Sequence, residues 1–364
     1  MENILPILKK QLEIYPKSAP QDILKALFQA VFGCEHFVTD EQKARERLQE
    51  ELRKSIPCNV GCLTEDFGEY SRIHLSKLDH DGISADTLLS LFIISAKAKP
   101  KNEKYQSLVE ELPLLCRNGE LPFSEREMKT LIEEQKALGY PPLHHSEIFR
   151  ESYNPSYRII RSEYADLFPL FQQIEKTMTK KEHTLIAIDG CCTGGKSTLA
   201  RLLHKIYGAD IIHMDDYFLT PEMKTEERLS QAGGNVDYER FLKEVLSPLS
   251  KGQSYISRPY RCHGGYYEAA TEKIPSRLTV VEGSYSLHKA LYPHYDLKIF
   301  LELDSHLQQL RVKSRNPEMF CKFIEEWIPL ENTYFEKTNI KSRCDIHIKT
   351  NEKIRYEVIK NEKK

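Results

Sequence analysis

The chain has 364 residues, of which 40% are hydrophobic and 29% are charged, and its mean hydropathy is −0.52. This composition excludes a disordered chain and a membrane-embedded one, and the length suits about two domains of ordinary size. The 52 basic and 54 acidic residues nearly cancel, so no overall positive field exists to hold nucleic acid. We therefore expect a cytoplasmic protein with neither nucleic acid nor a membrane as a partner. Nothing in the sequence predicts its oligomeric state.

Nine cysteines are scattered along the chain without the dense, even spacing of a secreted disulfide framework. We predict that they are free thiols. Cys58 and Cys62 resemble half of a zinc site, but no second Cys or His pair follows at ligand spacing, and a structural zinc site needs four ligands. The sequence therefore gives little support for a structural metal.

The composition changes near residue 180, where a polar, charged stretch separates two halves of different character. Upstream, apolar residues recur at helical spacing, and Ser84 and Ser124 are suited to cap two of the helices. The expected helices are 4–13, 20–32, 41–54, 85–97, 104–115 and 125–138. We predict a mostly α-helical domain over residues 1–175, with no role that the sequence identifies.

Downstream of this boundary, short apolar runs alternate with amphipathic stretches. The expected strands are 185–188, 211–214, 278–281, 297–303 and 345–348, and the expected helices include 197–207 and 238–249. Such alternation is typical of βαβ units in a parallel sheet. We predict an α/β domain over residues 183–350, with helices flanking a parallel sheet, followed by a charged tail over 351–364.

Residues 190–197, called the 190–197 loop below, carry the most specific motif of the chain. Their sequence, GCCTGGKS, matches G-x-x-x-x-G-K-[ST] between a predicted strand and a predicted helix. Glycines let backbone N–H groups close around phosphate oxygens, Lys196 can reach the β- and γ-phosphates of ATP, and the Ser197 hydroxyl can bind Mg²⁺. The residues expected to bind the nucleotide are Gly190, Thr193, Gly194, Gly195, Lys196, Ser197 and Thr198. The alternative is a glycine-rich turn that binds no nucleotide.

Acidic residues follow two further predicted strands. Asp215 and Asp216 come after the strand 211–214, and Glu282 comes after 278–281. Ligands of open α/β sheets bind at the carboxyl ends of the strands, where carboxylates can hold Mg²⁺ or act as a base. We expect Ser197, Asp215 and Glu282 to bind Mg²⁺. The alternative is that these acids are solvated strand ends.

Residues 183–349, a little under half of the chain, resemble the superfamily of P-loop small-molecule kinases that includes uridine kinase, phosphoribulokinase, nicotinamide riboside kinase and pantothenate kinase. The motifs that carry the resemblance are the 190–197 loop, 215–218 (DDYF), 235–241 (NVDYERF), 258–260 (RPY), 281–283 (VEG) and 311–315 (RVKSR). The resemblance implies a P-loop NTPase-type fold and an enzyme that uses ATP and Mg²⁺.

The resemblance also implies roles for individual residues. It makes Asp215 the general base toward the substrate hydroxyl, it places Asp237 and Tyr260 facing the substrate, and it makes Arg311 and Arg315 lid arginines that contact the phosphates. The expected catalytic residues are Lys196, Asp215, Arg311 and Arg315. The expected substrate-binding residues are Asp215, Asp237 and Tyr260.

Three features of the sequence depart from the pattern of uridine kinases. Tyr238 stands where these kinases typically have a His, Cys191 and Cys192 replace serines of the loop, and the 311–315 segment has fewer arginines. Because the loop amides and Lys196 favour an anion, we expect one or both cysteines to be reactive thiolates that Mg-ATP protects. The alternative is inert thiols in packed surroundings. The segment 327–331 is expected to belong to a packing helix that ends before Pro329.

The N-terminal half contains three clusters of polar and aromatic residues. They are 34–36 (CEH), 71–74 (SRIH) and the group His144, His145, Ser146, Glu147, Arg150, Tyr153, Pro155, Tyr157 and Arg158. Hydrogen-bonded histidines, helix-end arginines and core tyrosines are the plain interpretation. His80 and Asp81 invite a metal phosphohydrolase interpretation, but Gly82 and the cap at Ser84 place them in a turn. A regulatory or oligomerising domain is the remaining hypothesis.

From the sequence we expect an ATP-dependent kinase that phosphorylates a hydroxyl of a small metabolite, with a nucleoside as the expected acceptor. The 190–197 loop, Lys196, Mg²⁺, a base at Asp215 and lid cations are the parts that phosphoryl transfer requires. The alternative is a nucleotide-gated binding or regulatory protein without a phosphoryl acceptor. Such a switch would need the loop and Glu282, but it has no use for a base at Asp215.

Overall fold

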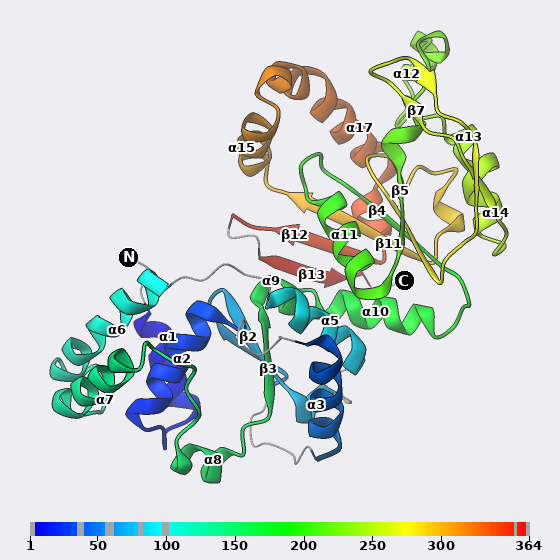
Figure 1. The fold of residues 1–364 in the computed structure, drawn as a ribbon. Helices are drawn as coiled ribbons and strands as arrows, with labels where there is room; N and C mark the ends of the chain where they lie inside the picture. Colours follow the sequence, from blue (N-terminus) through cyan, green and yellow to red (C-terminus); the bar gives the residue numbers. More distant parts are fainter. Residues whose placement is uncertain are drawn as a thin grey trace. The chain divides into compact units, whose positions relative to one another are not determined.

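The computed structural model describes residues 4–34, 40–54, 62–78, 83–96, 102–352 and 355–361. The chain divides into two compact units, Met1–Ala165 and Asp166–Lys364 (Figure 1). The second unit begins ahead of the boundary expected near residue 180, because Asp166 forms an ion pair with Arg355. No helix in the described part of the chain is long and apolar enough to cross a membrane.

The first unit is rich in helices, as expected. Its helices are α1 (Leu5–Ile14), α2 (Pro20–Phe32), α3 (Glu41–Lys54), the 3-10 helix η2 (Leu75–Lys77), α5 (Ala85–Ser95), α6 (Asn102–Arg117), α7 (Glu125–Ala137), α8 (Glu147–Tyr153) and α9 (Ser162–Asp166), which ends at the division. The hydroxyls of Ser84 and Ser124 accept hydrogen bonds from the amides of Thr87 and Glu127, so both predicted caps are confirmed. Helices α1, α2, α6 and α7 share one apolar core and lie together in Figure 1.

The first unit also contains a sheet that the sequence analysis did not predict. It is antiparallel with the order β1-β2-β3, formed by β1 (Thr64–Phe67), β2 (Tyr70–His74) and β3 (Tyr157–Arg161). All five residues of β2 are buried, so its sequence YSRIH shows no alternation of apolar and polar residues. The polar side chains are tolerated because they are bonded inside the fold: Arg72 to Glu65 and Ser71 to Ser162.

The second unit is built on a sheet with the order β13-β12-β11-β4-β10-β5 among the described residues. Its strands are β4 (Thr184–Gly190), β5 (Asp210–His213), β10 (Leu278–Glu282), β11 (Leu297–Leu303), β12 (Ile346–Thr350) and β13 (Tyr356–Lys360). All neighbours pair in parallel except β12 and β13. The expected α/β class and its strands are therefore confirmed, but residues 356–360, expected in a charged tail, form the edge strand β13, which pairs with β12.

Helices and short segments connect these strands. In the list below, η3, η4, η6 and η7 are 3-10 helices, and η5 and η8 are π-helices. The helices are α10 (Phe168–Met178), α11 (Lys196–Tyr207), η3 (Met214–Tyr217), η4 (Pro221–Met223), α12 (Glu226–Leu229), α13 (Tyr238–Phe241), η5 (Leu242–Leu246), α14 (Ser247–Leu249), η6 (Tyr292–His294), α15 (Ser305–Arg315), η7 (Pro317–Met319), α16 (Phe320–Lys322), η8 (Phe323–Trp327), α17 (Ile328–Thr338) and α18 (Ile340–Arg343). The short strands β6 (Tyr255–Ser257), β7 (Tyr260–Arg261), β8 (Tyr266–Tyr267) and β9 (Thr271–Lys273) form two small antiparallel pairs.

Strand β4 occupies a central position in the sheet of the second unit. Every residue of β4 is buried, which matches the continuous apolar run expected of a parallel strand covered on both faces. The chain passes from β4 through α11 to β5 at one edge, and later returns to β11 on the other side of β4. Because the strand order reverses here, the 190–197 loop leaves the sheet at the place where ligands of such sheets bind.

Candidate active site

The 190–197 loop connects the carboxyl end of β4 to α11. A side chain on Gly190, whose φ is +133°, would place its Cβ 2.1 Å from the carbonyl oxygen of Leu301, and a Cβ on Gly194 would lie 2.7 Å from the oxygen of Cys191. Glycine is therefore required where the loop passes close to other backbone. The helix α11 begins at Lys196, in the last part of the 190–197 loop, so its free N–H groups face the region that the loop surrounds.

Lys196 is folded back onto the loop. Its Nζ donates hydrogen bonds to the carbonyl oxygens of Gly190 (2.7 Å) and Cys191 (3.0 Å), and its side chain is buried. Burial alone would lower the pKa of Lys196, but the negative charges of Glu331, Asp189 and Asp215 outweigh it and raise that pKa above the ordinary value. The amine is therefore a fixed positive charge inside the loop.

The loop also has a polar atom without a partner in the described residues. The Oγ1 of Thr193 is buried and makes no hydrogen bond there, although buried hydroxyls are normally bonded. Together with the glycines and the Lys196 amine, this orphaned hydroxyl suits a loop that closes around a polyanion such as the phosphates of ATP. The residues present therefore fit the expected nucleotide.

Asp189, the residue before the loop, is a buried acceptor that the sequence analysis missed. Its carboxylate accepts hydrogen bonds from the amides of Gly190 (2.7 Å), Tyr285 (3.1 Å) and Leu287 (3.0 Å), and from the hydroxyl of Tyr334 (2.9 Å). It thereby joins the loop to the segment after β10 and to α17. An acid inside the apolar run 185–190 was the signal in the sequence, because a buried carboxylate requires such partners.

Glu331 of α17 is a second buried carboxylate that the sequence analysis did not assign. Its two oxygens accept hydrogen bonds from the amide of Cys192 (2.9 Å) and from the hydroxyl of Ser284 (2.5 Å). The expected packing helix that ends before Pro329 is wrong. Pro329 instead lies in the first turn of α17, which follows the π-helix η8 without a break, and the helix continues and carries Glu331 to the loop.

A third carboxylate of the site, that of Glu282, is bonded to Ser197 and His213. The Ser197 hydroxyl lies 3.1 Å from Glu282 Oε2, and His213 Nδ1 lies 2.6 Å from Glu282 Oε1. Strands β5 and β10 pair so that His213 stands opposite Glu282, which explains the contact. The hydrogen bond to Glu282 raises the pKa of His213. Two of the residues expected to bind Mg²⁺ are thus adjacent, and His213 is a neighbour that the sequence analysis did not predict.

Asp215 and Asp216 differ in their surroundings, although they are consecutive in the 3-10 helix η3. The Asp216 carboxylate is bonded to Arg261 at 2.6 Å. The Asp215 carboxylate makes no hydrogen bond or ion pair with the described residues. Asp215 is accessible to solvent, yet desolvation by the surrounding protein raises its pKa, with Glu282 acting in the same direction and Lys196 in the opposite one. Asp215 is therefore the acid left free at this edge of the sheet.

Part of this chain is similar in fold to solved structures of P-loop kinases. The similar structures are a possible uridine kinase from Bacillus stearothermophilus (18% identity, 48% of this chain and 98% of that chain, TM-score 0.37), a candidate fructose transport system kinase from Silicibacter sp. (20%, 46% and 93%, 0.39) and a phosphoribulokinase from Rhodobacter spheroides (15%, 46% and 70%, 0.35). No protein-family model and no curated protein matches the sequence. The similarity concerns the fold and covers less than half of the chain.

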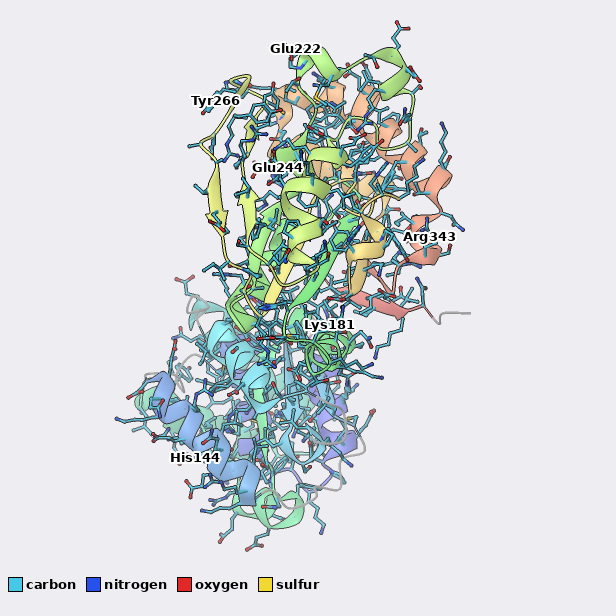
Figure 2. The ribbon with its side chains drawn as sticks, turned by 90° about the vertical axis from the view of Figure 1, so that its right-hand side faces the viewer. His144, Lys181, Glu222, Glu244, Tyr266 and Arg343 are labelled. Atoms are coloured by element: carbon cyan, nitrogen blue, oxygen red, sulfur yellow. The ribbon has the colours of Figure 1, made fainter. Side chains whose placement is uncertain are left out.

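The residues expected to face the substrate are engaged within the protein. The Asp237 carboxylate is buried, caps α13 by accepting from the amide of Arg240, and pairs with the Arg240 guanidinium at 3.2 Å. Arg240 also bonds to Glu244 on η5, which Figure 2 labels. Tyr260 is buried, with its ring 5.0 Å from that of Tyr267. In this structure, Asp237 and Tyr260 are therefore buried in segments that pack against η3.

The expected lid arginines both lie on α15. Arg311 donates a long hydrogen bond of 3.4 Å to the carbonyl oxygen of Thr193, so it already lies beside the loop. Arg315 is exposed one turn later and makes no hydrogen bond or ion pair with the described residues. Thr198 is exposed on the first turn of α11 and accepts a hydrogen bond from Arg201. The structure thus brings Arg311 to the loop and leaves Arg315 at the surface.

The expectation of reactive thiolates in the loop is wrong. Cys191 is buried, and desolvation raises the pKa of its thiol. Desolvation also raises the pKa of Cys192 to about 12, and the negative charge of Glu331 adds to this effect. The loop amides and Lys196 do not prevail because the Cys192 amide bonds to Glu331 and the Lys196 amine bonds to carbonyl oxygens. All described cysteines are free thiols.

Several residues of the sequence analysis lie outside the described part of the chain. They are Glu35, His36, Cys58, His80, Asp81 and Gly82.

Proposed function

We propose that this protein is an ATP-dependent kinase that transfers the γ-phosphoryl group to a hydroxyl of a small metabolite. The observation that carries the proposal is the free carboxylate of Asp215, in the electrostatic neighbourhood of Lys196 and Glu282 at the carboxyl edge of the sheet. A protein that only binds a nucleotide can hold Mg²⁺ with Ser197 and Glu282, so it has no need for a further unpaired carboxylate that acts as a base. A phosphotransferase needs a base at this position to accept the proton of the attacking hydroxyl.

The other residues around the loop would bind ATP and Mg²⁺. The loop amides, Thr193 and Lys196 would hold the phosphates, and Ser197 with Glu282 and Asp215 would hold the metal. Bound Mg²⁺ neutralises phosphate charge. Arg311 would add positive charge from α15. This arrangement supplies positioning and charge neutralisation, which make up most of what phosphoryl transfer requires.

We further propose a nucleoside as the acceptor. The pair β7 and β8 is linked to η3 by the ion pair of Arg261 with Asp216. On β8, Tyr267 keeps 37% of its surface exposed, and the guanidinium groups of Arg240 and Arg258 lie 5.1 and 4.9 Å from the centre of its ring. A partly exposed aromatic side chain on a strand pair that is linked to η3 supports binding of a flat base by stacking. The resemblance to uridine kinases supports the same acceptor class.

Release of ADP tests the proposal. The full chain is incubated with Mg-ATP and, in separate reactions, with nucleosides, pantothenate and sugar phosphates. The Lys196→Ala variant is the control for contaminating kinases. We expect one acceptor class to raise ADP release well above the acceptor-free rate, with the phosphorylated product detectable by mass spectrometry. Binding of ATP without acceptor-dependent ADP release for any compound would contradict the kinase proposal.

The second candidate is a nucleotide-gated regulatory protein. The observation that favours it is the ion pair of Asp237 with Arg240, because this carboxylate is then not free to bind an acceptor. The same experiment separates the two functions: a regulatory protein would bind Mg-ATP but would give no acceptor-dependent product.

A further inference from the structure

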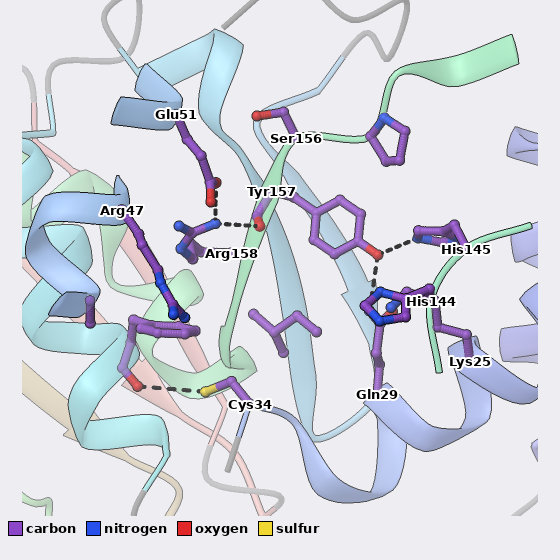
Figure 3. A pocket seen from close by; sticks show the side chains of 14 residues that line it. Lys25, Gln29, Cys34, Arg47, Glu51, His144, His145, Ser156, Tyr157 and Arg158 are labelled. Carbon is purple, nitrogen blue, oxygen red and sulfur yellow. Dashed lines mark hydrogen bonds and ion pairs between the residues drawn. The ribbon is translucent and has the colours of Figure 1, made fainter. Parts of the chain in front are cut away.

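The first unit contains a cavity of about 420 Å³ that the proposed function does not use. It lies between α2, α3, α5 and β3, and Figure 3 shows the side chains that line it. Its volume is within the range of small-molecule sites in proteins. The lining residues belong to the first unit alone, so the cavity is separate from the 190–197 loop.

The charged residues of the cavity are mostly cations. Lys25, Arg47 and Arg158 line it together with the carboxylate of Glu51. The ion pair of Arg158 with Glu51, at 2.6 Å, neutralises one cation and leaves a net positive charge. Arg47 projects from α3 without a hydrogen bond or ion pair to the described residues (Figure 3). Its guanidinium keeps all its donors for a ligand.

Lys25 places a second cation at the opposite wall. Its side chain is buried, and its Nζ donates one hydrogen bond of 2.6 Å to the carbonyl oxygen of Leu143. An ammonium group has three donors, so this carbonyl uses only one of them. Burial lowers the pKa of Lys25 to about 8, with Arg72 contributing, so the amine is still mostly protonated at neutral pH. A buried cation in this position is stabilised when an anion binds beside it.

A chain of hydrogen bonds fixes the polar wall between these two cations. Arg72 donates to Gln29 Oε1, Gln29 Nε2 donates to the Tyr157 hydroxyl, and that hydroxyl lies 2.6 Å from His145 Nε2. Because the Tyr157 hydroxyl accepts a hydrogen bond from Gln29, it donates its own hydrogen bond to His145 Nε2, and the Nδ1–H of His145 donates to Asp22. Burial lowers the pKa of His145 to about 4. The side chains of this chain that line the cavity, Gln29, Tyr157 and His145, are therefore uncharged, so Lys25 and Arg47 carry the charge for recognition.

The remaining part of the lining is apolar. Phe92 and Ile159 are buried residues with surface toward the cavity, and Cys34 and Ala44 extend the same side. An inorganic ion would leave this surface uncovered. A ligand with an apolar portion would cover it while its anionic group reached the cations.

We propose that this cavity binds a small organic anion, with a carboxylate or phosphate group held by Arg47, an apolar portion against Phe92 and Ile159, and the positive charge of Lys25 at the opposite wall. The first unit is then a ligand-binding domain, and its ligand is distinct from the nucleotide and the acceptor of the second unit.

The test uses benzoate and phenyl phosphate as probes, with benzamide as the neutral analogue and inorganic phosphate as the anion without an apolar portion. Binding to the full chain is measured by ligand-observed NMR. We expect at least one of the two aromatic anions to bind with a Kd below about 10 mM, as fits ligands of this size. Which of the two binds more tightly distinguishes a carboxylate ligand from a phosphate ligand. We expect benzamide and inorganic phosphate to bind at least tenfold more weakly.

Variants assign the binding to the cavity. Arg47→Gln removes the positive charge of an exposed side chain of α3 and should raise the Kd for the aromatic anion tenfold or more. Arg53→Gln makes the same change on the same helix outside the cavity and should leave the Kd within about twofold. Lys196→Ala should also leave it unchanged. Failure of both aromatic anions to bind the wild-type chain would overturn the proposal, as would a Kd that changes with Lys196→Ala but not with Arg47→Gln.

Discussion

The buried carboxylate of Glu331 accepts a hydrogen bond of 2.9 Å from the backbone amide of Cys192. This contact joins α17 to the 190–197 loop across more than a third of the chain. The same carboxylate raises the pKa of Lys196 and that of Cys192. One side chain thus helps to hold the loop, to keep its lysine charged and to keep its cysteine protonated.

Replacement of Glu331 by alanine should lower the free energy of unfolding of the second unit by about 1–3 kcal/mol, because the Cys192 amide loses its acceptor. Glu331→Gln retains an acceptor oxygen and should lose less. Glu336→Ala, at an exposed position of the same helix, is the matched control. Urea unfolding followed by Trp327 fluorescence measures the difference, and equal stability of Glu331→Ala and Glu336→Ala would contradict the assigned role.

Lys196→Ala should abolish nucleotide-dependent activity, because no other described residue places a cation against the Gly190 and Cys191 carbonyl oxygens. Circular dichroism checks that the variant folds. Wild-type ADP release by the folded variant, with any acceptor, would show that the 190–197 loop does not bind the phosphates.

Asp215→Asn should leave the affinity for ATP within about tenfold while lowering turnover roughly a hundredfold or more, the range expected for loss of a general base. Asp216→Asn is the control, because that carboxylate is already bonded to Arg261. Calorimetric binding and ADP release are measured on both variants. Equal loss of binding and turnover in Asp215→Asn would identify Asp215 as mainly a metal ligand, and no loss of either would remove it from the site.

The first unit should lose stability as the pH falls from 6.5 to about 4. Burial lowers the pKa of His145 from its ordinary value of 6.5 to about 4, and the hydrogen bond to Asp22 offsets only part of this effect. The unfolded chain therefore takes up a proton in this range before the folded chain does. Stability is complete above pH 6.5, and the loss between pH 7 and 5 is on the order of 2 kcal/mol.

Hydrogen exchange of the α2 amides at pH 7 and 5, corrected for the intrinsic exchange rate, measures this loss within the first unit. The pH dependence should be reduced in His145→Gln. It should persist in His144→Gln, because the side chain of His144 is exposed in the folded protein. The same pH dependence in both variants would assign the acid sensitivity to another group.

Local patterns were sufficient to predict much of the second unit. The strand β4, the 190–197 loop and the helix α11 follow one another in the sequence, so their spacing and glycines report directly on local geometry. Ser84 and Ser124 could also be predicted as helix caps, because a cap bonds to an amide three residues away. Strand β2 could not be predicted, because five consecutive buried residues leave no periodic pattern.

The sequence by itself determined the α/β class of the second unit, the position of its phosphate-loop motif and the acids at the strand ends, because each depends on neighbouring residues. Only the tertiary structure decided which acids are free. Arg261 forms an ion pair with Asp216, and Asp215 has no partner among the described residues. Arg240 forms an ion pair with Asp237, and Glu331 of α17 accepts a hydrogen bond from the loop. Burial and long-range partners set these states, and neither is encoded in the spacing of residues along the chain.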